Sequence, residues 1–157
     1  MESGDYYKII PRRCELKYRL YVHRGDVEVV AGVLSNAAFG TIVVNDWAAY
    51  DSLDSNKKLI ARVQGTHTHA ESNKHGNYFD NFRITFIDGS FKGSTLQVRG
   101  DHILKPAEWA IVGGSGEFTF AQGMVNKTLM GEPGQYTIVQ IDIYAIYTPP
   151  TPSPEQA

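Results

Sequence analysis

The last strand-like segment of the chain alternates strictly between two kinds of residue, and this pattern limits the folds that the chain can adopt. The segment from Tyr136 to Tyr147 reads YTIVQIDIYAIY. One face is mainly aliphatic and carries Thr137, Val139, Ile141, Ile143, Ala145 and Tyr147. The other face carries Tyr136, Ile138, Gln140, Asp142, Tyr144 and Ile146. A two-residue period is typical of a β-strand. Because the second face mixes Gln and Asp with tyrosines, we expect it to line a polar barrel lumen or a strand-lined cleft.

Strand signals recur along the rest of the chain, whereas helix signals are weak. The segment from Leu16 to His23 alternates in the same way, with Leu16, Tyr18, Leu20 and Val22 on one face. Further strand-like runs cover residues 41–44, 59–68, 82–87, 95–98, 109–112 and 118–120. About eight strands with little helix predict an all-β domain, either an antiparallel barrel or a sandwich.

Composition places the chain among ordinary globular domains. It has 157 residues, of which 42% are hydrophobic and 20% are charged, which suits one domain with a packed core. Acidic and basic residues are mixed along the sequence, and the formal net charge is -2. That balance argues against nucleic-acid binding, and no apolar run is long enough to span a bilayer. We therefore expect neither a nucleic-acid partner nor a membrane partner.

The two ends of the chain bear on localisation and domain organisation. The first residues, MESGDYYKIIPRR, lack the apolar region of a secretory signal. The single cysteine, Cys14, cannot form an internal disulfide, so we expect a cytoplasmic, reducing environment. Residues 148–157 read TPPTPSPEQA, which predicts a proline-rich linker or tail. The expected organisation is a β-domain over residues 1–147 and a tail over residues 148–157.

Three glycines interrupt the segment WAIVGGSGEFTFAQG, from Trp109 to Gly123. Glycine permits backbone angles that other residues resist, so the segment could be a phosphate loop, a hairpin corner or the wall of a ligand pocket. No Gly-Lys-Ser/Thr follows the glycines, and the next residues are strand-like rather than helical. We therefore predict a tight turn between two strands, with Glu117 and Gln122 carried near it.

Two histidines lie two residues apart in the segment from Thr66 to His69. Both would share one face of a predicted strand, a spacing that can hold a metal ion. A third ligand would have to come from His23, His75 or His102. The sequence contains no His-Glu-x-x-His motif, cysteine pair or Gly-x-Ser-x-Gly elbow. We therefore expect surface or pocket-lining histidines, with no metal, no cofactor and no catalytic nucleophile.

Aromatic residues close to polar side chains suggest a class of ligand. Trp47 follows Asp46 at the end of a predicted strand, and Trp109 precedes the glycine-rich turn. An aromatic ring can cover the apolar face of a sugar while Asp, Asn and Gln bond to its hydroxyls. This combination favours a carbohydrate, although each ring also suits ordinary core packing.

Several short motifs, in order over about residues 16–147, resemble those of plant dirigent domains. They are YRLYVH at 18–23, FGT followed by VVND at 39–46, ARVQG at 61–65, KGSTL with a later glycine at 92–100, and IVGGSGEFTFAQG at 111–123. The resemblance implies an eight-stranded antiparallel up-and-down β-barrel, lipocalin-like, with a pocket at one end. Typical members steer the coupling of phenoxy radicals or related quinone-methide chemistry, and they bind the intermediates rather than oxidise them.

The sequence departs from the dirigent pattern at positions that carry the family's chemistry. The family's Asp-Asp-Pro-x-Thr segment is here NDWAA at 45–49, and the Arg of its Ala-Arg-Gly motif is Gln122. Glu117 keeps the acid that often follows Gly-Gly-Thr-Gly. Together with the proline-rich tail, these departures resemble the dirigent-like domains of grass defence chimeras, in which a jacalin-type lectin domain follows the linker.

We therefore predict a non-catalytic recognition domain of a plant defence protein that binds carbohydrate at the open end of its barrel. We expect homo-oligomers and a jacalin-type lectin domain after the linker. Ligand binding is assigned to Asn45, Asp46, Trp47, Glu117, Gln122, Asp142 and Tyr144. The alternative is an active dirigent protein that steers stereoselective coupling of phenoxy radicals in lignan biosynthesis. A third hypothesis is a purely structural domain that oligomerises a lectin.

Overall fold

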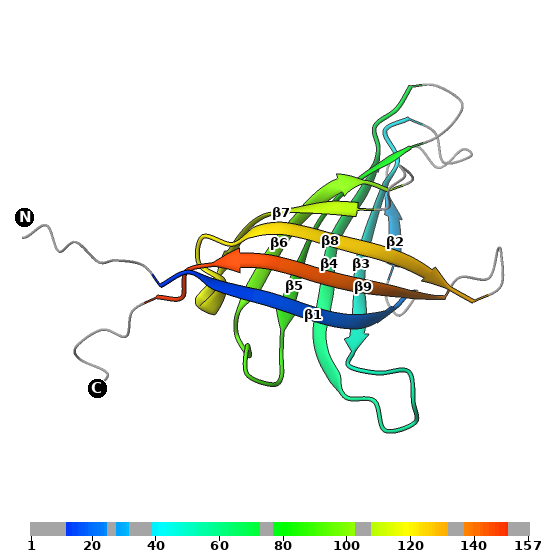
Figure 1. Ribbon diagram of the computed structural model, residues 1–157. Coiled ribbons are helices and arrows are strands. Elements are labelled where there is room, and N and C mark those ends of the chain that lie inside the picture. The colour runs from blue at the N-terminus through cyan, green and yellow to red at the C-terminus, as the bar shows by residue number, and fades with distance from the viewer. Residues whose placement is uncertain are drawn as a thin grey trace, which may run out of the picture.

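The chain forms one continuous antiparallel sheet that curls into a barrel (Figure 1). The computed structural model describes residues 12–24, 28–31, 39–72, 77–102, 108–131 and 137–150. Within these ranges the strands are β1 (Cys14–His23), β2 (Glu28–Ala31), β3 (Ile42–Tyr50), β4 (Leu59–His69), β5 (Tyr78–Phe86), β6 (Thr95–Asp101), β7 (Glu108–Ser115), β8 (Gln122–Met130) and β9 (Ile138–Tyr147). Most of the predicted tail lies outside the described residues, as do Tyr136 and His75.

Closure of the barrel depends on β3, which pairs with two different strands along its length. The strands follow the order β1-β9-β8-β7-β6-β5-β4-β3-β2. The ring closes because β1 also pairs with the second half of β3, where Tyr21 lies opposite Tyr50 and His23 opposite Ala48. The short strand β2 pairs with the first half of β3. The predicted eight-stranded antiparallel barrel is confirmed, with β2 added beside the closure.

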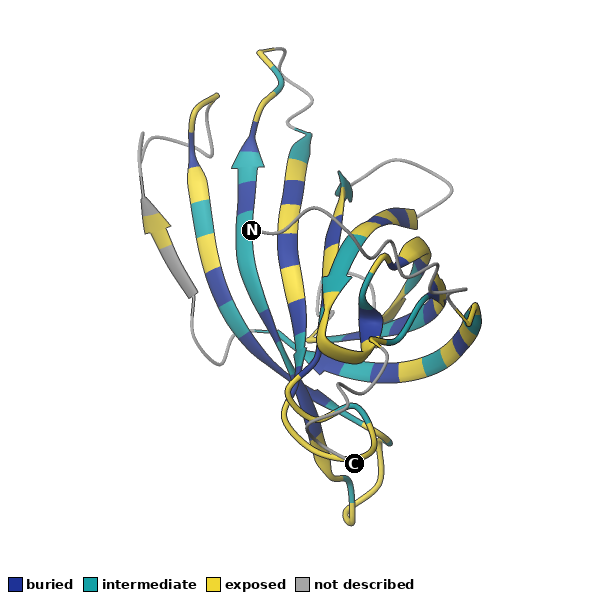
Figure 2. Ribbon diagram, turned by 90° about the vertical axis from the view of Figure 1, so that its left-hand side faces the viewer, coloured by how far each residue is buried: buried dark blue, intermediate teal, exposed yellow. Residues whose placement is uncertain are grey.

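Most buried residues of the barrel are apolar, and buried positions alternate with more exposed ones along the strands (Figure 2). On β1 the residues Leu16, Leu20 and Val22 are buried, as their alternation predicts. The aliphatic face of β9 is buried in the same way. Interior residues of facing strands thus fill the barrel with hydrocarbon, whose removal from water stabilises the fold.

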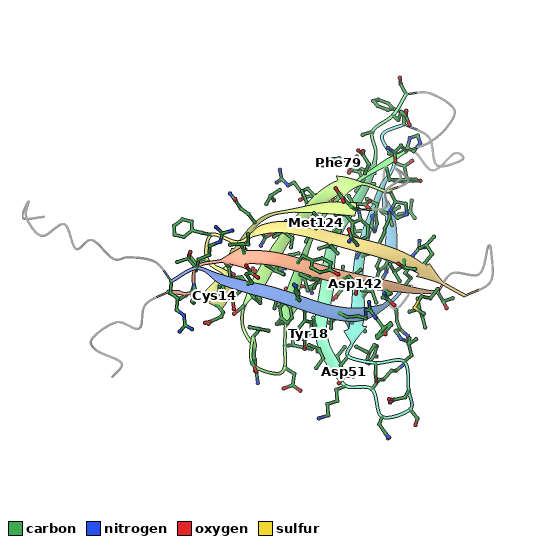
Figure 3. All side chains as sticks on the ribbon, viewed as in Figure 1. Cys14, Tyr18, Asp51, Phe79, Met124 and Asp142 are labelled. Atoms are coloured by element: carbon green, nitrogen blue, oxygen red, sulfur yellow. The ribbon has the colours of Figure 1, made fainter. Side chains whose placement is uncertain are left out.

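The prediction of a polar lumen was wrong, because the polar face of β9 lies outside the barrel. Tyr144 is 41% exposed, and the side chain of Asp142 projects from the outer surface (Figure 3). The physical reason is that the strand can turn only one of its two faces toward the interior. Burying the aliphatic face removes apolar surface from water, whereas burying Gln and Asp would require partners for each polar atom.

A short 3-10 turn, η1 (Gly116–Phe118), closes one end of the barrel. The sequence predicted a strand at residues 118–120, which was wrong. Instead β7 continues through the glycines, η1 makes the turn, Phe120 adopts a φ of 57°, and β8 begins after it. Phe118 is fully buried, and its ring packs against the rings of Phe86, Phe91 and Tyr147. No helix within the described ranges has the length and apolar character needed to cross a bilayer.

Candidate functional site

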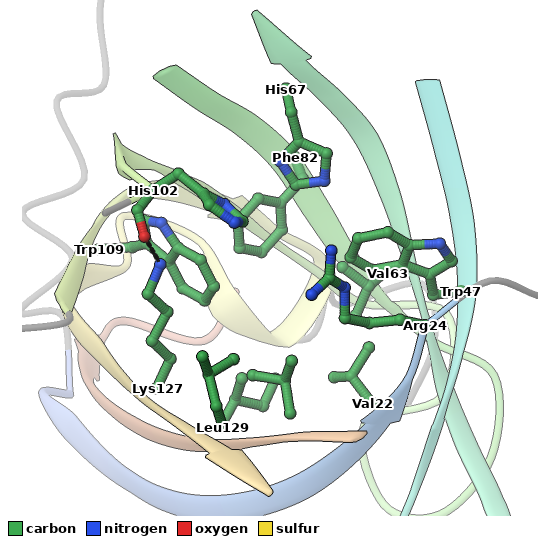
Figure 4. Close-up of a pocket in the computed structure, with 12 residues that line it drawn as sticks. Val22, Arg24, Trp47, Val63, His67, Phe82, His102, Trp109, Lys127 and Leu129 are labelled. Atoms are coloured by element: carbon green, nitrogen blue, oxygen red, sulfur yellow. Dashed lines mark hydrogen bonds between the residues drawn. The ribbon is translucent and has the colours of Figure 1, made fainter. Parts of the chain in front are cut away.

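A pocket opens at the end of the barrel opposite η1. Strand β8 starts beside η1 at Gln122 and reaches the pocket with Lys127 and Leu129, so the two ends are opposite. The walls combine indole, phenyl and aliphatic groups, including Trp47, Val63, Phe82 and Trp109 (Figure 4). Four residues that can carry a positive charge also line it: Arg24, His67, His102 and Lys127. The empty space in the pocket, including the part open to solvent, is about 470 Å³.

A fully buried acid, Asp80 of β5, connects three residues of the pocket wall. Its Oδ1 lies 2.5 Å from Nδ1 of His67. Its Oδ2 lies 2.9 Å from Nδ1 of His102 and 2.9 Å from Nε1 of Trp109. One carboxylate therefore orients two imidazoles and an indole that come from different parts of the sheet.

The protonation of this cluster follows from the chemistry of its donors. Burial would raise the pKa of Asp80, but the hydrogen bonds with His102 and His67 outweigh burial and hold that pKa below its usual value. Asp80 is therefore a carboxylate, which only accepts hydrogen bonds, so both histidines donate from Nδ1. In its neutral form, an imidazole that donates from Nδ1 carries its lone pair on Nε2. The Nε2 atom of His67 is buried and has no hydrogen-bond partner among the described residues.

Aromatic contacts fix the rings of the pocket relative to one another. His67 stacks on Trp47 with ring centroids 5.2 Å apart, and His102 meets His67 edge to face at 5.3 Å. Phe82 meets Trp109 edge to face at 5.0 Å. The pocket wall thus combines aromatic rings with a nitrogen of His67 that can accept a proton, the kinds of group that a ring with a hydroxyl uses.

Two basic side chains lie over the indole rings. The guanidinium carbon of Arg24 lies 5.4 Å from the centre of the Trp47 ring. The ammonium of Lys127 lies 4.4 Å from the centre of the Trp109 ring, and it donates a hydrogen bond to the backbone carbonyl oxygen of His102. Burial lowers the pKa of Lys127 below its usual value.

The histidine pair predicted from the Thr66–His69 segment divides between two environments. Both His67 and His69 are buried on one face of β4, but Asp80 joins His67 to His102 rather than to His69. The nitrogen and oxygen atoms of His67, Asp80 and His102 that could bind a metal ion lie within 4.8 Å of one another. Ligands of one tetrahedral zinc ion would lie about 3.3 Å apart, whereas the oxygen-to-nitrogen distances here are 2.5 Å and 2.9 Å. The donor geometry is that of a hydrogen-bonded cluster.

The residues predicted on β3 point in alternate directions. Trp47 lies inside the strand rather than at its end, and it lines the pocket. Asn45 is buried, and its Nδ2 donates to the carbonyl oxygen of Val63 over 3.0 Å. Asp46, between them, faces outward and accepts a 2.8 Å hydrogen bond from Nε of Arg62, which lowers the pKa of Asp46.

The other predicted site residues lie away from the pocket. Gln122, Asp142 and Tyr144 line shallow depressions on the outer surface of β1, β8 and β9. Asp142 is bound there by Arg19 over 2.5 Å. Glu117 lies on η1, at the opposite end of the barrel. Of the predicted set, which falls wholly within the described ranges, only Trp47 lines the pocket.

The sequence reasoning missed Asp80, although a signal for it was present. The inward positions of β5 are Asp80 followed by Phe82, Ile84 and Phe86, all buried. An acid on an otherwise apolar strand face needs buried donors, and the histidines of the neighbouring strand are the obvious candidates. Arg24 and Lys127 carry no comparable signal, because isolated basic residues are common on any surface.

Comparisons with known proteins agree with the observed fold. The family model described as "Dirigent-like protein" matches residues 19–146. The solved structure of the pterocarpan synthase dirigent protein GePTS1 superposes with a TM-score of 0.77 at 24% identity, covering 94% of this chain and 92% of that chain. At this identity the likeness concerns the fold.

Curated relatives share more sequence over shorter stretches. Pterocarpan synthase 1 of Glycine max is 36% identical over 88 residues, which cover 54% of this chain and 47% of that protein. Dirigent protein 1 of Arabidopsis thaliana is 32% identical over 114 residues, which cover 71% of this chain and 59% of that protein. The chain thus spans about half the length of the curated relatives it matches.

Proposed function

Since the chain belongs to the dirigent family, we propose that its pocket binds a planar phenolic compound and directs the stereochemistry of that compound's reaction. The observation that carries this proposal is the union of aromatic walls with an oriented proton acceptor. Trp47 and Trp109 contribute aromatic surface to the pocket wall, and the buried Nε2 of His67 has no hydrogen-bond partner among the described residues. A phenol uses both kinds of group, because its ring is apolar and its hydroxyl donates.

The hydrogen-bonded cluster of Asp80, His67 and His102 can take a proton from the bound phenol. The hydroxyl of the phenol donates to Nε2 of His67, and transfer of that proton gives a phenolate and an imidazolium. The carboxylate of Asp80, 2.5 Å from Nδ1, stabilises the imidazolium and stays ionised throughout. An external one-electron oxidant takes an electron from the phenolate to give the phenoxy radical, and the imidazolium releases its proton to solvent. Holding the ring in one orientation leaves one face open to its reaction partner, which is the basis of stereochemical control.

Relatives support an active role in steering the reaction. Several bear the name dirigent protein, and two bear the name pterocarpan synthase. The replacement of the family's Arg by Gln122 is the sequence argument for passive recognition. That argument is weakened by the position of Gln122 on the outer surface, while the described pocket carries its own cations and proton acceptor.

Ligand binding can be measured directly, because both tryptophans of the chain line the pocket. We expect coniferyl alcohol to quench the intrinsic fluorescence in a saturable way. Replacing His67 by Phe keeps the ring but removes the acceptor, and it should weaken binding about tenfold. The control is Asp142→Asn on the outer surface, which should bind like the unmodified protein.

Stereochemical control is tested by coupling coniferyl alcohol with an external one-electron oxidant. We expect an enantiomeric excess in the dimers formed with the unmodified protein and its loss in His67→Phe. A racemic product with the unmodified, ligand-binding protein would refute the steering role and leave a recognition module.

A second candidate, carbohydrate binding, is favoured by the outer surface of β1, β8 and β9. Tyr144 is 41% exposed there and shares shallow depressions with Gln122 and with the Arg19–Asp142 ion pair. An exposed ring flanked by polar groups suits a sugar. Calorimetry with a panel of oligosaccharides at millimolar concentration tests this, with Tyr144→Ala as the variant; no heat from any sugar would refute it. A following jacalin-type lectin domain and homo-oligomers stay predictions.

A further inference from the structure

Two basic side chains face the pocket without a salt bridge among the described residues. Arg24 directly follows β1, and Lys127 lies on β8. Both line the pocket, and Figure 4 shows the guanidinium and the ammonium extending into it from different walls. Two basic groups without an acidic partner in one pocket favour an anionic ligand.

Asp80 balances only one of these two charges. Its oxygens already accept hydrogen bonds from His67, His102 and Trp109. The acid is also fully buried within the wall. Among the described residues that line the pocket or contact Asp80, the single negative charge of Asp80 does not balance both Arg24 and Lys127, and a bound anion would supply the missing negative charge.

The cations are held in fixed positions, as a binding site requires. Arg24 lies over the ring of Trp47 and Lys127 over the ring of Trp109, at 5.4 Å and 4.4 Å. These cation–π contacts orient the charged groups without using their hydrogen-bond donors. Lys127 donates one N–H to the carbonyl oxygen of His102, and within the described part of the chain the other ammonium donors and the guanidinium group have no hydrogen-bond partner, so they can bind a ligand.

We propose that the pocket selects a phenolic compound that also carries a carboxylate. The carboxylate lies against Arg24 and Lys127, the ring packs on the apolar wall of the pocket, and the phenol hydroxyl points to His67. The inference rests on the proposed function, because it names the substrate class of the same pocket. Charge-assisted hydrogen bonds to a carboxylate are shorter and stronger than those to an alcohol, so the acid should bind more tightly than its neutral analogue.

A matched pair of probes tests the preference for a carboxylate. Ferulate and coniferyl alcohol share the ring, the phenol and the propenyl chain, and they differ only in a carboxylate against a hydroxymethyl group. Quenching of tryptophan fluorescence at low ionic strength should give an affinity about tenfold higher for ferulate. Raising the salt concentration should weaken ferulate binding and leave coniferyl alcohol binding nearly unchanged.

Two variants assign the preference to the named residues. Arg24→Gln and Lys127→Gln should each lower the ferulate affinity about tenfold and change coniferyl alcohol binding by less than about twofold. Arg19→Gln is the control, because it removes an equal charge from the outer surface. If Lys127→Gln does not fold, Arg24→Gln and the salt dependence of the unmodified protein decide.

The outcomes separate this inference from the proposed function. Tighter binding of ferulate than of coniferyl alcohol, with the difference lost in both variants, supports the carboxylate preference. Equal or tighter binding of coniferyl alcohol overturns the carboxylate preference and leaves phenol binding intact. Binding of neither probe overturns both proposals.

Discussion

His67 and Asp80 are direct partners across neighbouring strands: the register of β4 and β5 places their Cα atoms opposite each other, and Nδ1 of His67 lies 2.5 Å from Oδ1 of Asp80. The imidazole is therefore oriented by the same ladder that builds the barrel. Its free Nε2 is set before any ligand arrives, which reduces the cost of ordering the site on binding.

Asp80→Asn should destabilise the fold and release one of the two histidines. The amide keeps the shape of the carboxylate but offers only one oxygen, so one of its donors loses a buried acceptor. We expect a loss of about 2–4 kcal/mol in the free energy of unfolding, measured by urea denaturation. Asp142→Asn, which breaks an ion pair on the outer surface, should cost less than about 1 kcal/mol. Equal effects of the two variants would contradict a structural role for Asp80.

Acid should weaken the protein in part through Asp80. Its folded-state pKa lies below the usual value of 3.8, so the folded protein binds this proton less readily than the unfolded chain. The contribution of Asp80 to stability is complete above the unfolded-state pKa and is lost as the pH falls through the folded-state pKa. Unfolding free energies measured between about pH 6 and pH 2 should therefore fall toward acid.

The same pH series on Asp80→Asn isolates that contribution. Its stability should fall less steeply toward acid than that of the unmodified protein. Some slope should remain, because hydrogen bonds from Arg62 and Arg19 also lower the pKa of Asp46 and of Asp142. Identical slopes would show that Asp80 does not contribute to the loss of stability in acid.

Two adjacent glycines of β7 should respond differently to the same substitution. A Cβ on Gly114 would meet the carbonyl oxygen and the Cβ of Phe118 and the carbonyl oxygen of Thr95, whereas a Cβ on Gly113 meets nothing within 4 Å. Gly114→Ala should therefore cost at least about 2 kcal/mol of stability. Gly113→Ala should be neutral within about 0.5 kcal/mol or slightly stabilising. Thermal denaturation of the pair tests this, and similar melting temperatures would count against the close packing of Gly114 on Phe118.

Two phenylalanines that bracket the end of η1 offer a similar comparison. Phe118 is fully buried at the closed end of the barrel, whereas Phe120 is 80% exposed. Phe118→Ala should cost about 3–5 kcal/mol of unfolding free energy, because it leaves a cavity among aromatic rings. Phe120→Ala should change stability by less than about 0.5 kcal/mol. A large effect of Phe120→Ala would mean that its ring is covered in solution.

The barrel could be predicted because strand periodicity is a local property. The alternation of the segment from Leu16 to His23 identified the interior face of β1, and the last strand was found within two residues of its start. The turn at η1 was mistaken for a strand because Phe118 and Phe120 alternate as strand residues do. Alternation alone does not distinguish a strand from a 3-10 turn followed by a residue with positive φ.

The site was harder to predict, because its members meet only through the register of the sheet. Asp80 and His102 are far apart in sequence, and nothing local indicates that they share a hydrogen bond. The alternation of β9 was recognised, but its two faces were assigned the wrong way with respect to Asp142 and Tyr144. Which face turns inward depends on the competition for burial among all strands, which no single segment contains.

The closure of the barrel has a consequence for how the chain reaches its structure. Its first long strand, β1, pairs along its whole length with the last strand, β9, from Cys14 opposite Tyr147 to His23 opposite Ile138. A ribosome therefore delivers β1 long before its partner exists. Contacts this distant in sequence slow folding, and during that wait the edge of β1 stays open to pairing with other chains. The pairing of β1 with β9 is therefore a step at which misassembly during synthesis can occur.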